Sequence, residues 1–115
     1  MDPARARFLL DAADAEAIRA LADLGAEIGS ITAARQDANS DDEHDPEGTT
    51  LAYERSQADA LRRAAELRRA EIADAVARLN AGRYGRCARC GRLIADGRLE
   101  ARPWAGLCVA DAARR

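Results

Sequence analysis

All three cysteines of this 115-residue chain lie in one C-terminal stretch, and their spacing constrains the fold more than any other feature. Cys87 and Cys90 form a Cys-x-x-Cys-Gly knuckle, which points two thiolates at one metal ion while Gly91 lets the backbone turn. Seventeen residues separate Cys90 from Cys108, and Asp111 stands where a fourth cysteine would complete a four-sulfur zinc site. The pattern predicts a metal site with the ligands Cys87, Cys90, Cys108 and Asp111.

The carboxylate in the fourth position leaves the metal content open. Aspartate binds zinc through oxygen, but this harder ligand makes the site weaker or more exchangeable than a four-sulfur site. The alternative is a finger that has lost its metal and is held by packing alone. A redox pair is less favoured, because the βαβ pattern that usually accompanies it is missing. We expect Zn²⁺ as the cofactor, with a labile or empty site as the alternative because the fourth ligand is Asp111.

Length and charge point to one small domain, alone or with an extended element. The net charge of −2 conceals an asymmetry: residues 1–50 carry 12 acids and 4 arginines, whereas residues 51–115 carry 8 acids and 14 arginines. An acidic half followed by a basic half indicates that different surfaces meet different partners. A general DNA-binding protein would show an overall positive excess, so we expect no direct sequence-specific DNA binding.

No secretion signal is recognisable, since the apolar patch at residues 8–10 is far too short. No segment is long and apolar enough to span a membrane. Three cysteines in a metal-type spacing fit a reducing compartment, and we expect a cytoplasmic protein.

The first long segment reads as a helix from Asp2-Pro3 to about Gln36, with Asp2 as the N-cap and Pro3 at the first helical position. Apolar residues recur there at intervals of three and four. They predict one buried stripe made of Ile18, Leu21, Leu24 or Gly25, Ile28 and Ile31.

A second helix is predicted from about Thr49 or Thr50 to Ala81, ending at Asn80-Ala-Gly82. Its seam follows a spacing of seven, and further apolar residues widen the same face. The seam residues are Leu51, Ala58, Ala65, Ile72 and Leu79, widened by Leu61, Ala75 and Val76.

Between the helices, residues 37–50 form an acidic loop rich in Asp, Glu, Asn, Pro and Gly. Two helices of some 30 residues joined by a short loop fold back as an antiparallel hairpin, with arms of roughly 45 Å. A slender hairpin with a charged tip suits entry into a deep channel. The plainer alternative is an ordinary helical hairpin, or part of a dimeric bundle, with a solvated acidic tip.

The C-terminal residues are expected to form a compact finger. Residues 92–94 and 98–100 are predicted to pair as a small β-hairpin across Asp96-Gly97. Residues 109–115 are compatible with a helix, which would place Cys108 and Asp111 on one face.

Three motifs give the chain a family resemblance. Tyr-Gly-x-Cys-x-x-Cys-Gly at 84–91, Arg-Leu-Glu-Ala-Arg-Pro at 98–103 and Leu-Cys-x-x-Asp at 107–111 closely resemble the DksA/TraR family. Asp-Asp-Glu-His-Asp-Pro-Glu-Gly at 41–48, followed by an arginine-rich helix, resembles its actinobacterial-type members. The resemblance implies a bacterial regulator that binds RNA polymerase, inserts a coiled coil into the secondary channel and alters the lifetime of promoter complexes.

The resemblance also assigns roles to single residues. Arg98 and Arg102 match family arginines beside the finger, and the resemblance implies an anion or polymerase contact there. It places ppGpp in that region in some members. Glu71 and Ala112 stand at positions that are basic in such members, so ppGpp binding stays open here, with the sequence favouring its absence. The polymerase-facing acids of the tip are Asp41, Asp42, Asp45 and Glu47, with Asp45 as the best match.

These observations predict a mainly α fold: a long antiparallel coiled-coil hairpin over residues 1–82, with its tip loop at about 37–50, and a DksA/TraR-type zinc finger over 83–115 that ends in a short helix. The predicted function is transcription regulation through RNA polymerase. The alternative is a structural or adaptor protein that uses the hairpin for dimerisation or for docking on another partner. An enzyme is not expected, because no catalytic set can be assembled around His44, the one histidine.

Overall fold

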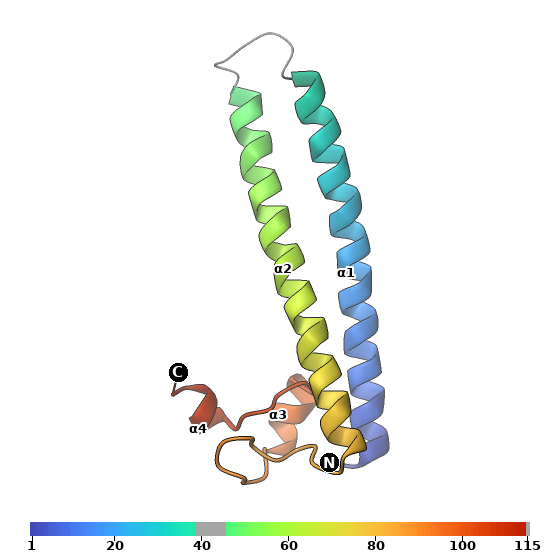
Figure 1. Ribbon diagram of the computed structural model, residues 1–115, viewed down its shortest axis with the longest axis vertical. Coiled ribbons are helices and arrows are strands. Elements are labelled where there is room, and N and C mark those ends of the chain that lie inside the picture. The colour runs from blue at the N-terminus through green and yellow to red at the C-terminus, as the bar shows by residue number, and fades with distance from the viewer. Residues whose placement is uncertain (39–45, 115) are drawn as a thin grey trace. The chain divides into compact units, whose positions relative to one another are not determined.

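The computed structural model describes residues 1–38 and 46–114, and this part of the chain is mainly helical. Two long helices, α1 (Pro3–Ala38) and α2 (Pro46–Asn80), precede two short ones, α3 (Asp96–Ala101) and α4 (Val109–Ala112) (Figure 1). The described residues contain no β-strand, only an isolated antiparallel bridge between Arg86 and Leu93. The predicted fold class, a helical hairpin followed by a small cysteine-bearing region with a short final helix, is confirmed.

The ends of the long helices follow local sequence signals. At the start of α1, the Arg5 backbone N–H donates to the Asp2 carboxylate at 3.4 Å, as expected for an N-cap. Helix α2 begins at Pro46, earlier than predicted, because proline is well suited to a first helical position. After α2 the chain leaves the helix through Gly82, whose φ of 74° lies in the left-handed region.

The described chain divides into two compact units, one of residues 17–66 and the other of residues 1–16 with 67–115. In the unit of residues 17–66, α1 and α2 pack through Leu24, Ile31 and Ala58, which are flanked by Ile28 and Leu51. A polar contact joins the two helices in the same unit, where the Arg55 guanidinium donates to the Thr32 hydroxyl at 2.6 Å.

Two residues were wrongly predicted to lie on the buried faces of the helices. Ile18 and Leu61 are exposed, whereas Ala17 is buried. The seam of α1 keeps a spacing of seven through Ala17, Leu24 and Ile31, so Ile18 falls one position outside it. On α2 the same register buries Ala58 and turns Leu61 to solvent.

In the second unit, the start of α1 and the end of α2 pack against the finger. Leu10, Ile72 and Ala75 form a buried cluster, against which Tyr84 and Trp104 of the finger pack. A second cluster of Cys87, Ile94 and Leu99 forms the core of the finger itself. The finger is therefore built onto the paired helix ends of its own unit.

The predicted β-hairpin between residues 92–94 and 98–100 was wrong, because Asp96–Ala101 form helix α3. The backbone N–H groups of Arg98 and Leu99 both donate to the Ala95 carbonyl, at 3.0 and 3.1 Å. The acidic Asp96 in the first turn favours this helix start. The helix directs Leu99 into the finger core, where its side chain is fully buried.

Candidate metal centre

The knuckle of the finger is fixed by backbone hydrogen bonds. The Gly91 N–H donates to the Cys87 carbonyl at 2.9 Å and closes a tight turn, in which Gly91 has a φ of 75°. The Cys87 N–H donates to the Arg92 carbonyl at 2.8 Å, beside the bridge between Arg86 and Leu93. These bonds hold Cys87 and Cys90 at the two ends of one turn.

The second pair of predicted ligands lies on α4. Cys108 is the N-cap residue of this helix, and Asp111 lies in its first turn. The Asp111 carboxylate reaches back to the Cys108 thiol, with 3.4 Å between Oδ2 and Sγ. The predicted placement of these two side chains on one helical face is therefore observed. The backbone N–H of Ala88 donates to the Gly106 carbonyl at 2.9 Å and joins the knuckle to the segment that leads into α4.

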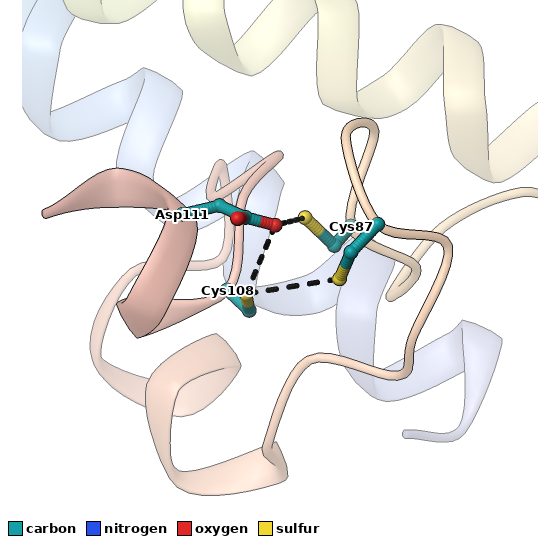
Figure 2. Close-up of side chains that lie close together, drawn as sticks. Cys87, Cys108 and Asp111 are labelled. Atoms are coloured by element: carbon teal, nitrogen blue, oxygen red, sulfur yellow. Dashed lines mark hydrogen bonds between the residues drawn. The ribbon is translucent and has the colours of Figure 1, made fainter. Parts of the chain in front are cut away.

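The structure brings all four predicted donors together. One ligand atom from each of Cys87, Cys90, Cys108 and Asp111 lies within 4.8 Å of every other. The Asp111 carboxylate points at the thiols of Cys87 and Cys108 (Figure 2), with 3.0 Å from its Oδ2 to the Cys87 Sγ. The Sγ atoms of Cys90 and Cys108 are 3.9 Å apart.

These separations fit a tetrahedral zinc site. A Zn–S bond of about 2.3 Å places two sulfurs about 3.8 Å apart at the tetrahedral angle. With a Zn–O bond of about 2.0 Å, a sulfur and an oxygen lie about 3.5 Å apart. The observed S–S distance of 3.9 Å and S–O distance of 3.4 Å are close to these edges, and the S–O distance of 3.0 Å from Cys87 is about 0.5 Å shorter. The residues present therefore fit a Zn²⁺ ion held by three thiolates and one carboxylate oxygen.

Asp111 is the buried charged residue of the described chain, with 7% of its surface exposed. Hydrogen bonds from the thiols of Cys87, Cys90 and Cys108, together with the charge of Arg89, hold the pKa of Asp111 below its usual value against the effect of burial. The carboxylate is thus ionised, which is the form that binds a metal ion. A buried ionised group facing three thiols is the arrangement that a cation would neutralise.

The pKa of the Cys87 thiol is also shifted towards the form that binds a metal ion. The neighbouring Asp111 carboxylate raises the pKa of the Cys87 thiol, and so does burial. The backbone N–H groups of Cys90, Cys108 and Arg89 oppose them, and the pKa of Cys87 ends below its ordinary value. At Cys87 these backbone groups therefore favour the thiolate, which is the ligand form of cysteine. At Cys90 the backbone N–H of Arg92 also lowers the pKa, but burial and hydrogen bonds with Asp111, Cys87 and Cys108 raise it to about 11.

Contacts around the cluster include residues that sequence reasoning missed. The Arg89 guanidinium donates to the Asp111 carbonyl at 3.3 Å and thereby connects the knuckle to α4. The Arg68 guanidinium lies over the Trp104 ring, 3.7 Å from its centre, and Arg78 donates to the Trp104 carbonyl at 3.3 Å. These two arginines of α2 hold the finger loop to the helix. No spacing in the sequence signals these pairs, because the partners are far apart along the chain.

The predicted anion or polymerase contacts lie beside a cavity of about 660 Å³ within the same unit. Arg98 and Arg102 line it, together with Arg78, Glu71 and Asp74. The Arg98 Nε donates to the Leu107 carbonyl at 2.9 Å, so part of this guanidinium is already engaged. The role of the two arginines stays a prediction.

The predicted acidic tip falls outside what the structure describes. Asp41, Asp42 and Asp45 lie between the described ranges. Glu47 belongs to α2, but its side chain is not described. The tip acids therefore stay a prediction from the sequence.

The comparison with protein families decides what kind of finger this is. Residues 82–114 match the family described as the prokaryotic dksA/traR C4-type zinc finger. The finger is of the dksA/traR C4 type. The part of the predicted resemblance that rests on the motifs at 84–111 is thus confirmed, and in this finger Asp111 occupies the place of the fourth cysteine of the C4 pattern.

The fold is also similar to that of a solved structure, transcription factor DksA2 from Pseudomonas aeruginosa. The two chains are 24% identical, the match covers 99% of this chain and 88% of the other, and the TM-score is 0.54. No curated protein sequence matches this chain. In the described residues, neither long helix has the length of apolar sequence needed to cross a lipid bilayer.

Proposed function

We propose that this protein is a bacterial transcription regulator that binds RNA polymerase. It inserts its helical hairpin, acidic tip first, into the secondary channel and changes the stability of promoter complexes. The observation that carries the proposal is a DksA/TraR finger packed on the ends of two long helices, in a fold that resembles a transcription factor over nearly the whole chain.

The chemistry of the proposed contact belongs to the tip. Four of its acids, Asp41, Asp42, Asp45 and Glu47, concentrate negative charge in the sequence that joins the two helices and begins α2. Carboxylates there pair with basic residues of a channel, or perturb the groups around a catalytic magnesium ion. The factor makes and breaks no bond, so it acts in the cytoplasm as a ligand of the polymerase rather than as an enzyme.

The finger supplies rigidity in this proposal. Cys87, Cys90, Cys108 and Asp111 would hold Zn²⁺, which when bound cross-links the knuckle to α4 and so stabilises a small core. The core of Ile94 and Leu99 and the stack of Arg68 on Trp104 then fix the finger on the helix ends.

The proposal does not include ppGpp. The cavity beside Arg98 and Arg102 also presents the carboxylates of Glu71 and Asp74. Two carboxylates next to a polyphosphate would repel it and offset the attraction of the arginines. We therefore expect the activity to be independent of ppGpp.

Co-purification with core RNA polymerase tests the proposal. The informative variant is Asp42→Lys with Asp45→Lys, and the control is Asp11→Lys with Asp23→Lys, which makes the same charge change at two exposed acids of α1. We expect all proteins to bind polymerase, but the tip variant alone to lose its effect on promoter-complex lifetime. A wild-type protein that is never retained by polymerase would refute the proposal and favour an adaptor that uses the hairpin for another partner.

A further inference from the structure

The DksA/TraR finger carries an arginine at every third position through the knuckle: Arg83, Arg86, Arg89 and Arg92. All four are exposed. We call these residues the arginine repeat. The metal site uses only the charge of Arg89, which helps to keep Asp111 ionised, and the proposed insertion of the hairpin requires none of the four.

The arginine repeat has no carboxylate partner among residues 1–38 and 46–114. The arginines that form ion pairs in this part of the chain, such as Arg5 and Arg69, lie on the long helices. Nearby acids are engaged elsewhere, since Glu100 bonds to Arg5 and Asp111 faces the cysteines. Arg89 acts on the Asp111 carboxylate through its charge, but Arg83, Arg86 and Arg92 form no ion pair in the described residues and leave a positively charged surface.

Two members of the repeat are held in place by the backbone. An Arg86 guanidinium N–H donates to the Gly91 carbonyl at 3.3 Å, and Arg89 donates to the Asp111 carbonyl at the same distance. Each guanidinium keeps further N–H groups exposed. Arginines fixed in this way lose less side-chain entropy when they bind a carboxylate through two parallel hydrogen bonds.

An apolar side chain lies within this surface. Leu93 is 71% exposed and stands opposite Arg86 across the isolated bridge. An exposed leucine beside arginines suits a protein surface with an apolar socket and an acidic rim. It does not suit single-stranded nucleic acid, whose bases stack on free aromatic rings, and the phosphates of a duplex would make no use of the leucine. Both aromatic rings of the finger are engaged: the Tyr84 hydroxyl donates to the Pro103 carbonyl, and Trp104 lies under Arg68.

We propose that the arginine repeat and Leu93 dock on an acidic protein surface that surrounds an apolar socket. In the complex proposed above, this surface belongs to RNA polymerase, so the inference rests on the proposed function to that extent. The contact is separate from that of the acidic tip. It gives the protein two charged surfaces of opposite sign, one for each of two sites on its partner.

The test measures the affinity for core RNA polymerase over a range of salt concentrations. The docking variant is Arg86→Glu with Arg92→Glu, which leaves Arg89 and its bond to the Asp111 carbonyl intact. The control is Arg7→Glu with Arg114→Glu, which makes the same charge change at exposed arginines of the same unit. Leu93→Ser removes the apolar side chain of the proposed docking surface. Circular dichroism and zinc content establish that each variant is folded.

We expect the docking variant to bind polymerase at least about tenfold more weakly at low salt and with a shallower salt dependence, while the control is unchanged. Leu93→Ser should weaken binding at every salt concentration without changing the slope. If wild type and docking variant bind polymerase alike, the inference is wrong while the proposed function stands. Arginine-dependent binding to a short DNA duplex or single-stranded RNA, with polymerase binding unaffected, would also overturn it.

If wild type does not bind polymerase at all, the proposed function fails, and a synthetic glutamate- and leucine-rich peptide then decides the inference. Binding of this peptide by wild type and the control, but not by the docking variant, supports the docking surface. Equal binding by all three, or no binding by any, overturns it.

Discussion

Replacing Asp111 with alanine tests whether this carboxylate is a ligand of the metal ion. The Asp111 Oδ2 lies 3.0 and 3.4 Å from the sulfurs of Cys87 and Cys108, within reach of an ion bound between them. Structural zinc sites bind the ion with about 10–16 kcal/mol, which corresponds to about 2.5–4 kcal/mol for each of four ligands. Water takes the vacated position in sites with three protein ligands and recovers part of this energy. We therefore expect a net loss of about 2–3 kcal/mol, or about 30- to 150-fold in zinc affinity.

The assay is competition with a chromophoric zinc chelator at constant pH, beside Asp111→Cys. The cysteine variant restores the four-sulfur set and should retain zinc at least as well as wild type. Asp96→Ala is the matched control, because it removes an exposed carboxylate from the same finger. Substitution by Co²⁺ adds a spectroscopic count of thiolates, which should be three in wild type and in Asp111→Ala, and four in Asp111→Cys. Equal zinc occupancy and affinity in all three proteins would remove Asp111 from the ligand set.

Three further outcomes are expected. Leu99→Ala should lower the free energy of unfolding by about 3–4 kcal/mol in urea titrations, because it leaves a cavity in the finger core. Replacement of the exposed Leu93 by alanine should cost less than about 0.5 kcal/mol, and similar losses in the two variants would contradict the assigned core. The bond from Arg5 lowers the pKa of Glu100 from 4.5, so the pair stabilises the fold above that value and the effect disappears as pH falls through the lowered pKa. The stability difference between wild type and Glu100→Gln should therefore be constant near neutral pH and vanish in acid; a difference independent of pH would refute this. Chelation of the metal should lower the melting temperature of wild type, and a melting curve unchanged by chelator would show that the finger is held by packing alone.

The sequence was most informative about features that depend on the spacing of residues, namely the metal ligands and the buried helix faces. The interval between the two ligand pairs predicted that Cys87, Cys90, Cys108 and Asp111 would meet, and their donors do lie within one site. The apolar period likewise predicted two long helices, because one buried stripe suffices to pair them. The prediction for Ile18 was wrong because Ala17 and Ile18 are adjacent and both apolar. Only the register of α1 against the partner helix determines which of the two is buried.

Tertiary packing determined what the sequence could not show. Asp96-Gly97 is a turn signal, but an acidic residue also favours a helix start, and burial of Leu99 selected the helix. The stack of Arg68 on Trp104 joins segments that are distant in sequence. The sequence carries no information about such pairs, since neither side chain alone indicates which partner it will contact.

The most direct measurement of the central claim is the position of the tip in a complex with RNA polymerase. A photo-crosslinking amino acid in place of Asp42 would report what lies next to the tip, and the same group in place of Asp11 would serve as a reference on α1. The account predicts that the tip cross-links to the walls of the secondary channel near the catalytic centre. Efficient cross-links from the tip to the outer surface of polymerase, or no complex with purified polymerase, would contradict it.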